Sequence, residues 1–267
     1  MTRFIALFVA LLAGVGVAVW YYRAPAAGGG GVPAVIVRND DRWLDDLQSR
    51  SPKNVEQATA ELEERGTAAL PILRRTLQDA GATPERRKAA LKGAAILGAR
   101  AAEAIPDVAD ILQEPDYAPE AALALSFMGS AAVAPLREAI QSDNPIVRRE
   151  ALRGMGKLRE RASIDPQIVI PALLHGLEDA DPTVRNVAVT YLGIVRDSPQ
   201  TEVPGLIKAL ADENSEVRQA AAAALSEYGT LAEPAIPALK KASNDPDEEV
   251  RREAGRTLVH LAELKTR

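Results

Sequence analysis

The chain lacks the residues on which most catalytic and metal sites depend. It has no cysteine and only two histidines, His175 and His260, among 267 residues. The absence of cysteine excludes disulfides, thiolate nucleophiles and cysteine-ligated zinc. The two histidines stand apart, in the segments LLHGLED and LVHLAEL, and neither is followed by a glutamate. We therefore expect no metal, no cofactor and no catalytic residue, and we interpret His175 as a solvent-facing helix residue.

Phosphate-binding loops and serine-nucleophile motifs are missing as well. The run Gly28–Gly31 follows no strand and opens no helix, so it does not resemble a phosphate-binding loop. No serine lies in a Gly-x-Ser-x-Gly setting. The chain is accordingly expected not to be an enzyme.

Aromatic residues and excess positive charge are both scarce. Aromatics make up 4% of the chain, and 32 lysines and arginines face 37 aspartates and glutamates. Nucleic-acid binding depends on neutralising phosphates and on stacking bases against aromatic rings. The composition therefore argues against a nucleic-acid partner.

One long apolar run is present, at the N-terminus. Phe4 to Tyr22 carries no charge and is bracketed by Arg3 and Arg23. About twenty apolar residues cross a bilayer as a helix, and aromatic residues such as Trp20 favour the membrane interface. A cleaved secretory signal is the alternative, since Ala24-Pro25-Ala26 offers small residues for cleavage. The length of the run and the adjacent arginine favour a retained anchor.

The domain boundaries follow from this segment. We predict a signal anchor over 1–23, a flexible linker over 24–38, and a single folded region over 39–267. Either interpretation of the N-terminus places that region outside the cytoplasm, tethered to the membrane or secreted after cleavage. Small residues repeat every four positions within the anchor, Gly14 among them. This spacing allows close helix packing in lipid, and so a weak homodimer.

Prolines recur along the remaining chain roughly every 33 residues, a period typical of stacked helical repeats. They are Pro71, Pro106, Pro135, Pro171, Pro204 and Pro237. Proline is tolerated in the first turn of a helix, so each is predicted to begin the second helix of a unit. The preceding first helices are expected to start after the N-caps Asn144, Asp181 and Asn214. Glycines are expected near their ends, at Gly98, Gly129, Gly156, Gly193 and Gly229.

The segments that begin at residues 144, 181 and 214 resemble HEAT-like repeats of the phycobilisome-lyase type. The shared pattern is Asp/Asn-Pro-x-Val-Arg, followed by Leu-Gly and then by a proline-led helix. Residues 52–143 match this pattern less well. The resemblance implies an all-α, right-handed α-solenoid of about fourteen helices, with a half unit at each end. It also implies a protein-binding scaffold, or alternatively an auxiliary subunit of a lyase acting on a chromophore or a modified protein.

Two sets of charged residues are candidate functional residues. The first lies three and four positions after the prolines, on what the resemblance makes the concave side, and we call it the second-helix face: Arg74, Arg75, Glu138, His175, Lys208, Lys240 and Lys241. Basic residues outnumber acidic ones at these positions in a chain that is acidic overall. An acidic protein partner is one interpretation of that reversal, and an ordinary solvated surface is the other.

The second set, the arginine ladder, recurs directly after the valine of each first helix. Its members are Arg148, Arg185, Arg218 and Arg251. An aspartate closes each preceding unit, at Asp143, Asp179, Asp212 and Asp245. The arginines could form a basic stripe for an acidic ligand. The matched spacing favours a structural role instead, in which each arginine binds a loop carboxylate and ties one unit to the next.

Overall fold

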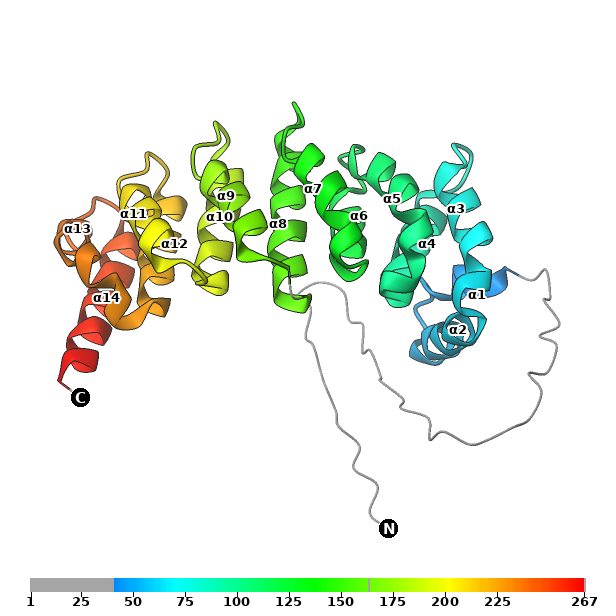
Figure 1. Cartoon of the computed structure of the whole chain (residues 1–267), viewed down its shortest axis with the longest axis horizontal. Helices are drawn as coiled ribbons and strands as arrows, with labels where there is room; N and C mark the ends of the chain where they lie inside the picture. Colours follow the sequence, from blue (N-terminus) through cyan, green and yellow to red (C-terminus); the bar gives the residue numbers. More distant parts are fainter. Residues whose placement is uncertain (1–40, 163, 267) are drawn as a thin grey trace, which may run out of the picture. The chain divides into compact units, whose positions relative to one another are not determined.

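The computed structural model describes residues 41–162 and 164–266, which are helical throughout and contain no strand. The chain divides into two compact units, Met1–Arg42 and Trp43–Arg267, and the second is the one described here. Its helices follow one another in chain order (Figure 1). The predicted membrane helix, the linker and the homodimer contact of Gly14 fall outside the described residues. Within the described part, no helix is both long enough and apolar enough to cross a membrane.

The helices alternate between two layers. The first layer contains α2 (Pro52–Arg65), α4 (Pro84–Leu97), α6 (Ala118–Phe127), α8 (Pro145–Arg161), α10 (Pro182–Val195), α12 (Ser215–Glu227) and α14 (Glu248–Lys265). The second contains α1 (Arg42–Asp46), α3 (Leu70–Gln78), α5 (Ile105–Leu112), α7 (Val133–Ala139), α9 (Pro166–Gly176), α11 (Pro199–Ala209) and α13 (Ile236–Ala242). Short 3-10 turns η1 (Gly66–Ala69), η2 (Gly98–Ala104), η3 (Ser130–Ala132) and η4 (Gly229–Ala235) precede α3, α5, α7 and α13. The described residues thus hold fourteen α-helices, as the repeat pattern predicts.

Each helix packs mainly on the next helix of its own layer and on the adjacent helices of the other layer. In the first layer, α2 to α14 contact one another in succession, and in the second layer α3 packs on α5, α5 on α7, and α9 on α11. Small and medium aliphatic side chains fill the space between the layers, such as Leu73, Leu173 and Leu239, each fully buried. Burial of this kind between adjacent units, repeated along the chain, is how a solenoid gains stability.

The predicted N-caps of the first helices are confirmed. The side chain of Asn144 accepts a hydrogen bond from the N–H of Ile146 at 2.9 Å. Asp181 accepts from Thr183 at 2.8 Å, and Asn214 accepts from Glu216 at 2.9 Å. These bonds satisfy backbone donors that the helix itself leaves unpaired.

Two of the predicted second-helix starts are wrong. Pro171 and Pro204 lie inside α9 and α11, which begin five residues earlier, at Pro166 and Pro199. Asp165 caps α9 through the N–H of Gln167 at 2.9 Å. In these two units a full helical turn occupies the place that a 3-10 turn takes before α3, α5, α7 and α13. A second proline, Pro166 or Pro199, begins each of these extended helices, and in α9 a side-chain cap adds to it.

The glycines serve two different purposes. Gly98, Gly129 and Gly229 have positive φ and close their helices, as predicted. Gly156 and Gly193 do not, since both lie within helices. A Cβ on Gly156 would collide with the ring of Tyr191, and one on Gly193 would lie 2.9 Å from the Cβ of Ala224. These two glycines allow adjacent first-layer helices to approach closely.

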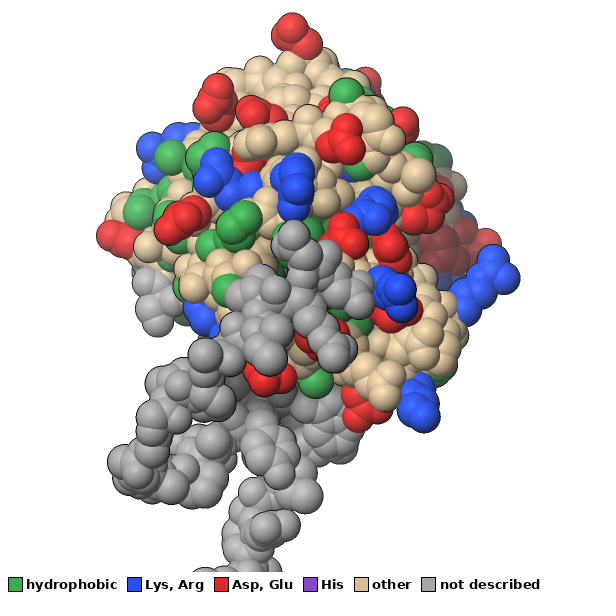
Figure 2. Space-filling model, turned by 90° about the vertical axis from the view of Figure 1, so that its right-hand side faces the viewer, with side chains coloured by type: hydrophobic (Ala, Val, Ile, Leu, Met, Phe, Trp, Pro, Cys, Tyr) green, Lys and Arg blue, Asp and Glu red, His purple; other side chains and the backbone are tan. Residues whose placement is uncertain are grey.

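One end of the repeat region shows how charge is distributed on its surface. Figure 2 views this region from its α1–α3 side, where Lys and Arg side chains are interspersed with Asp and Glu. No area of a single sign dominates the visible part of that face.

Candidate functional site

Most of the second-helix face is open to solvent. Six of its seven predicted members are exposed: Arg75, Glu138, His175, Lys208, Lys240 and Lys241. They lie on α3, α7, α9, α11 and α13 of the second layer, while α5, between α3 and α7, carries none of them. The structure thus places them on one layer, and their part in binding stays a prediction.

Arg74 differs from the rest of the set because it already has a partner. Its Nε lies 2.6 Å from Oδ2 of Asp107 on α5. Gln78 donates to the other oxygen of the same carboxylate at 2.5 Å, and Asp107 is 6% exposed. This hydrogen-bonded ion pair raises the pKa of the Arg74 guanidinium. Arg74 thus links α3 to α5 through a hydrogen-bonded ion pair.

Counting from the prolines misplaced the register of one unit. In most units the fully buried aliphatic residue lies two positions after the proline, as Leu73 does after Pro71. In the unit of Pro135 the buried residue is Leu136, which directly follows the proline. Ala134 therefore occupies the place that proline has elsewhere. The outward positions of α7 are Arg137 and Glu138, both exposed, rather than Glu138 and the buried Ala139.

Arg137 is the functional candidate that the proline count missed. The spacing of Leu136 and Ile140, which matches Leu73 and Leu77 in α3, was the signal that would have revealed it. Within the described residues, no ion pair forms at five cations of this face: Arg75, Arg137, Lys208, Lys240 and Lys241. These five side chains remain available to an external anion.

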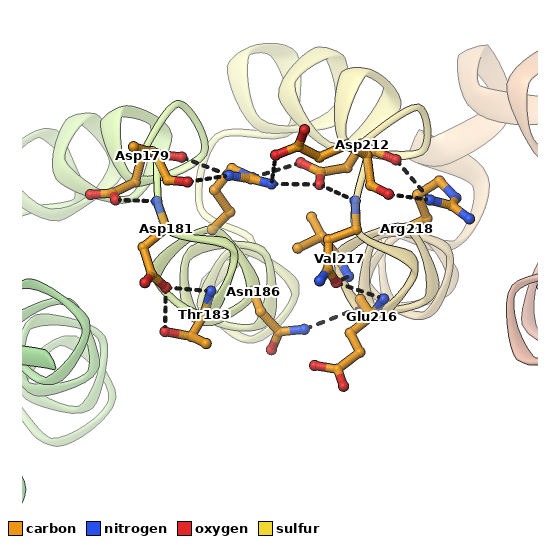
Figure 3. Close-up of polar contacts among 12 residues, drawn as sticks. Asp179, Asp181, Thr183, Asn186, Asp212, Glu216, Val217 and Arg218 are labelled. Atoms are coloured by element: carbon orange, nitrogen blue, oxygen red, sulfur yellow. Dashed lines mark hydrogen bonds and ion pairs between the residues drawn. The ribbon is translucent and has the colours of Figure 1, made fainter. Parts of the chain in front are cut away.

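The arginine ladder has the opposite character (Figure 3). Arg185 directs Nε and Nη2 at the two carboxylate oxygens of Asp212, each at 2.8 Å. Its Nη1 donates to the carbonyl oxygens of Asp179 and Ala180, at 2.9 and 3.0 Å. The guanidinium thus joins the loop before its own helix to the loop of the next unit. With 8% of its side chain exposed, it has little access to solvent.

The same geometry recurs in the neighbouring units. Arg148 binds both oxygens of Asp179 at 2.7 Å, and Arg218 binds those of Asp245 at 2.8 and 2.7 Å. The carboxylate comes in each case from the loop that closes the arginine's own unit and leads to the next one, whereas the loop before the arginine's helix contributes backbone carbonyls. Each arginine is therefore a tie between consecutive loops.

The loop aspartates are also held by backbone donors. Asp179 accepts the N–H of Asp181 at 2.8 Å, and Asp245 accepts the N–H of Asp247 at 2.9 Å. The hydrogen bond from Arg218 is the main reason that the pKa of Asp245 lies below its usual value. For Asp179, burial opposes ionisation, but the bonds from Arg148 and from the Asp181 N–H outweigh it and lower the pKa. The ladder carboxylates are stabilised in their charged form.

The two ends of the series deviate in an informative way. Arg87 binds the carboxylate of Glu114 at 3.1 and 3.0 Å and the carbonyl of Asp79, so a glutamate replaces the aspartate in this weakly matching unit. Arg251, in the last unit, donates only to the carbonyls of Asp245 and Pro246. No later loop follows α14 in the described chain to supply a carboxylate.

No group of three or more histidine, aspartate or glutamate residues within 41–162 and 164–266 is arranged to hold a metal ion. His175 is exposed on α9, as expected for a solvent-facing position. The geometry of the site is that of a surface with charged side chains, suited to binding.

The repeat geometry and its arginine-aspartate ties agree with a sequence match to a known family. Residues 170–259 match the model of the family described as HEAT repeats. These residues are HEAT repeats. They cover α10 to α13 and include the Arg185–Asp212 and Arg218–Asp245 pairs. No curated protein sequence matches the chain.

Solved structures with the same architecture extend the likeness beyond that segment. A chain in the structure of Kap95p with RanGDP has a TM-score of 0.65 and 14% identity, over 84% of this chain and 33% of its own length. Kap121p has a TM-score of 0.60 and 17% identity, over 83% of this chain and 27% of its own. The chain thus spans a third or less of these two neighbours.

A further match is a chain from the complex of CpcE and CpcF of phycocyanin lyase from Nostoc sp. PCC7120. Its TM-score is 0.49 and its identity 23%, over 58% of this chain and 98% of that one. At these identities the likeness concerns the fold. The described part of the chain is a HEAT/armadillo-type helical repeat scaffold.

Proposed function

We propose that this protein is a membrane-tethered scaffold whose second-helix face binds an acidic segment of a partner protein outside the cytoplasm. The observation that supports the binding role is the contrast between two groups of cations. The ladder arginines are bound to carboxylates and carbonyls of the protein itself, while Arg75, Arg137, Lys208, Lys240 and Lys241 form no ion pair with the described residues. A protein surface that leaves cations unpaired on one face attracts anionic partners.

The binding role can be tested with a labelled peptide. A nine-residue peptide of alternating aspartate and glutamate is titrated into the full chain in detergent, and fluorescence anisotropy reports binding. We expect the triple variant Lys208→Glu, Lys240→Glu, Lys241→Glu to weaken binding at least tenfold, as reversal of three charges replaces attraction by repulsion. Raised salt should weaken wild-type binding in the same direction.

The matched control alters cations on other parts of the surface. Lys53 and Arg100 are exposed and belong to α2 and η2 rather than to the second-helix face. A triple variant that also reverses the exposed Arg50 before α2 (Arg50→Glu, Lys53→Glu, Arg100→Glu) changes the same number of charges and should bind like the wild type. Equal loss in both variants would mean that only net charge matters, and would remove the second-helix face as the binding site.

The tether rests on the apolar run from Phe4 to Tyr22, with boundaries at 1–23 for the anchor, 24–38 for the linker and 39–267 for the scaffold. We expect native protein to remain in the membrane fraction after carbonate extraction and to retain its first residues. N-terminal sequencing of the mature protein checks this. Chains that begin near Ala27 would establish cleavage, and secretion would then replace anchoring.

A second function is favoured by one observation, the lyase-type pattern that begins at residues 144, 181 and 214. An auxiliary subunit of a lyase would act on a chromophore or modified protein together with a partner chain and would itself be non-catalytic. Purification from native membranes distinguishes the two functions. A stoichiometric second solenoid subunit with visible-light absorption supports the lyase role, whereas a colourless complex with an acidic protein supports the scaffold.

A further inference from the structure

A groove of about 340 Å³ opens where the second layer is least regular, between α7 and α9. Val133 and Ala134 of α7 line one side, and Ile164 and Ile168 line the other. Ile164 is 6% exposed, while Val133 and Ile168 are half-buried against the core. The floor is therefore apolar, and the groove is open to solvent above it.

The groove arises from an irregularity of this particular unit. Ala134 occupies the place that proline has in the other second helices, and Ser130 and Ala131 before it are also small. On the far side, α8 is 17 residues long, compared with 14 for α10, and α9 starts anew at Pro166. The small side chains on the α7 wall leave this space open.

The charges at the groove indicate what it can accept. Arg137 lines it, is exposed, and forms no ion pair with described residues. Asp165 also lines it, but its carboxylate is engaged in capping α9. On the following second-layer helices lie Lys208 of α11 and Lys240 and Lys241 of α13. The apolar floor complements a large apolar side chain. Arg137 beside it and the lysines on the following helices complement acidic residues in the same partner segment.

We propose that the α7–α9 groove is the anchor pocket of the second-helix face, and that it receives a single large aliphatic side chain of an acidic peptide segment. The acidic residues around that side chain then interact with Arg137 and with the lysines of α11 and α13. This inference rests on the proposed function, since it specifies which acidic segment binds. The groove has ample room for a large aliphatic side chain, and the exposed cations near it favour a partner that is otherwise anionic.

Two labelled peptides test the pocket on the full chain in detergent. One is a nonapeptide of aspartate and glutamate with a central leucine, and the other has serine in its place. Burying a leucine side chain should make the first peptide bind roughly tenfold more tightly than the second. An Ala134→Trp variant, which fills the groove, should abolish that difference and leave the affinity for the serine peptide unchanged.

The control is Ala68→Trp, at an exposed alanine of η1 before α3, which should keep the tenfold preference. Circular dichroism establishes that both variants are folded. If α7 does not tolerate tryptophan, Ala134→Leu provides the second test, with the same expected loss of preference. Light scattering with and without peptide identifies a second copy of the chain as the occupant, an outcome that would overturn the proposal.

The possible failures are distinguishable. Equal wild-type affinity for the leucine and serine peptides overturns the pocket while leaving the acidic-partner function intact. A preference that survives Ala134→Trp places the leucine elsewhere and also overturns it. If neither acidic peptide binds, the function of the second-helix face fails, and the pocket fails with it.

Discussion

Arg185 and Lys208 carry the same charge one helix apart, yet their surroundings have little in common. The guanidinium of Arg185 makes five hydrogen bonds to two loops and is almost entirely covered. Lys208 is exposed and forms no ion pair with a described residue. The difference separates the cations that hold successive units together from those that can engage a partner. It also implies that substitutions in the two regions should affect different measurements.

The largest expected effect on folding stability is that of Arg185→Ala. The substitution removes the tie to the preceding loop and leaves the half-buried carboxylate of Asp212 without its main partner. We expect a loss of about 1–3 kcal/mol in the free energy of unfolding, measured by urea denaturation. Peptide binding should be unchanged below the unfolding transition.

Arg251→Ala is the matched control for this prediction. Arg251 bonds only to the carbonyls of Asp245 and Pro246 and has no carboxylate of a following unit. Its removal should cost about 0.5 kcal/mol. Equal losses at Arg185 and Arg251 would show that the bidentate aspartate contributes nothing to the ladder.

Acid should weaken the ladder. The pKa of Asp245 is depressed, mainly by its hydrogen bond with Arg218, so the folded state favours the ionised form. A depressed pKa contributes stability above the unfolded-state value, near 4, that is lost as the pH falls through the folded-state value. We therefore expect the urea concentration at the unfolding midpoint to decrease once the pH is lowered below about 4.

The variant Arg218→Ala provides the comparison for the acid series. Without the guanidinium, the pKa of Asp245 returns toward its ordinary value, and the variant should lose less stability than the wild type between pH 5 and pH 3, a range chosen to span the usual carboxyl pKa of about 4. Parallel curves for the two proteins would refute the electrostatic role of this pair.

The sequence predicted the ladder better than its connections. The dipeptide Val-Arg recurs shortly after the N-cap of each first helix, and this identifies the arginines. The same helix position in every unit must direct its side chain the same way. The dipeptide does not identify the carboxylate, since Asp143 and Asp179 lie on either side of Arg148 in the chain. Only the stacking of units determines that the following loop provides it. The half units at both ends were predictable because the apolar face of a terminal repeat has to be covered, and we interpret α1 and α14 as the helices that cover it.

The second-helix face was harder to predict because proline was taken as the register marker. Proline tolerates several positions in a first turn, so Pro135 could shift by one residue while buried Leu136 and Ile140 kept the packing constant. The shift hid Arg137 and the groove beside it. Gly156 and Gly193 were mistaken for helix ends for a related reason: glycine serves equally in a left-handed cap and at a close helix contact, and a single sequence does not distinguish the two.

A buried carboxyl sharpens the comparison, because its pH dependence has the opposite sign to that of the ladder. Glu202 is fully buried; its Oε2 accepts hydrogen bonds from the N–H of Ser198 at 3.1 Å and from the hydroxyl of Tyr228 at 3.0 Å. Its Oε1 has no hydrogen-bond partner among the described residues. Burial raises the pKa of Glu202, and the negative charge of Asp197 acts in the same direction.

Glu202→Gln should therefore stabilise the protein at neutral pH by about 1 kcal/mol, the cost of one buried carboxylate oxygen without a donor. A raised pKa contributes stability below the unfolded-state value that is lost as the pH rises through the folded-state value. The gain should accordingly vanish near pH 4, where the wild-type carboxyl is neutral. Thermal melts at pH 4 and pH 7 measure it, and a variant less stable than the wild type at both pH values would refute this role.

The smallest effect on folding is expected on the second-helix face. Lys208→Ala and Lys241→Ala remove exposed side chains that form no ion pair with described residues, so the free energy of unfolding should change by at most about 0.5 kcal/mol. Affinity for the acidic nonapeptide should nevertheless fall several-fold in the double variant, because a cation near the bound anion contributes to binding without contributing to the fold. Denaturation and anisotropy on the same samples measure both quantities. A stability loss comparable to that of Arg185→Ala would mean that these lysines are part of the scaffold, and the division between the two regions would no longer hold.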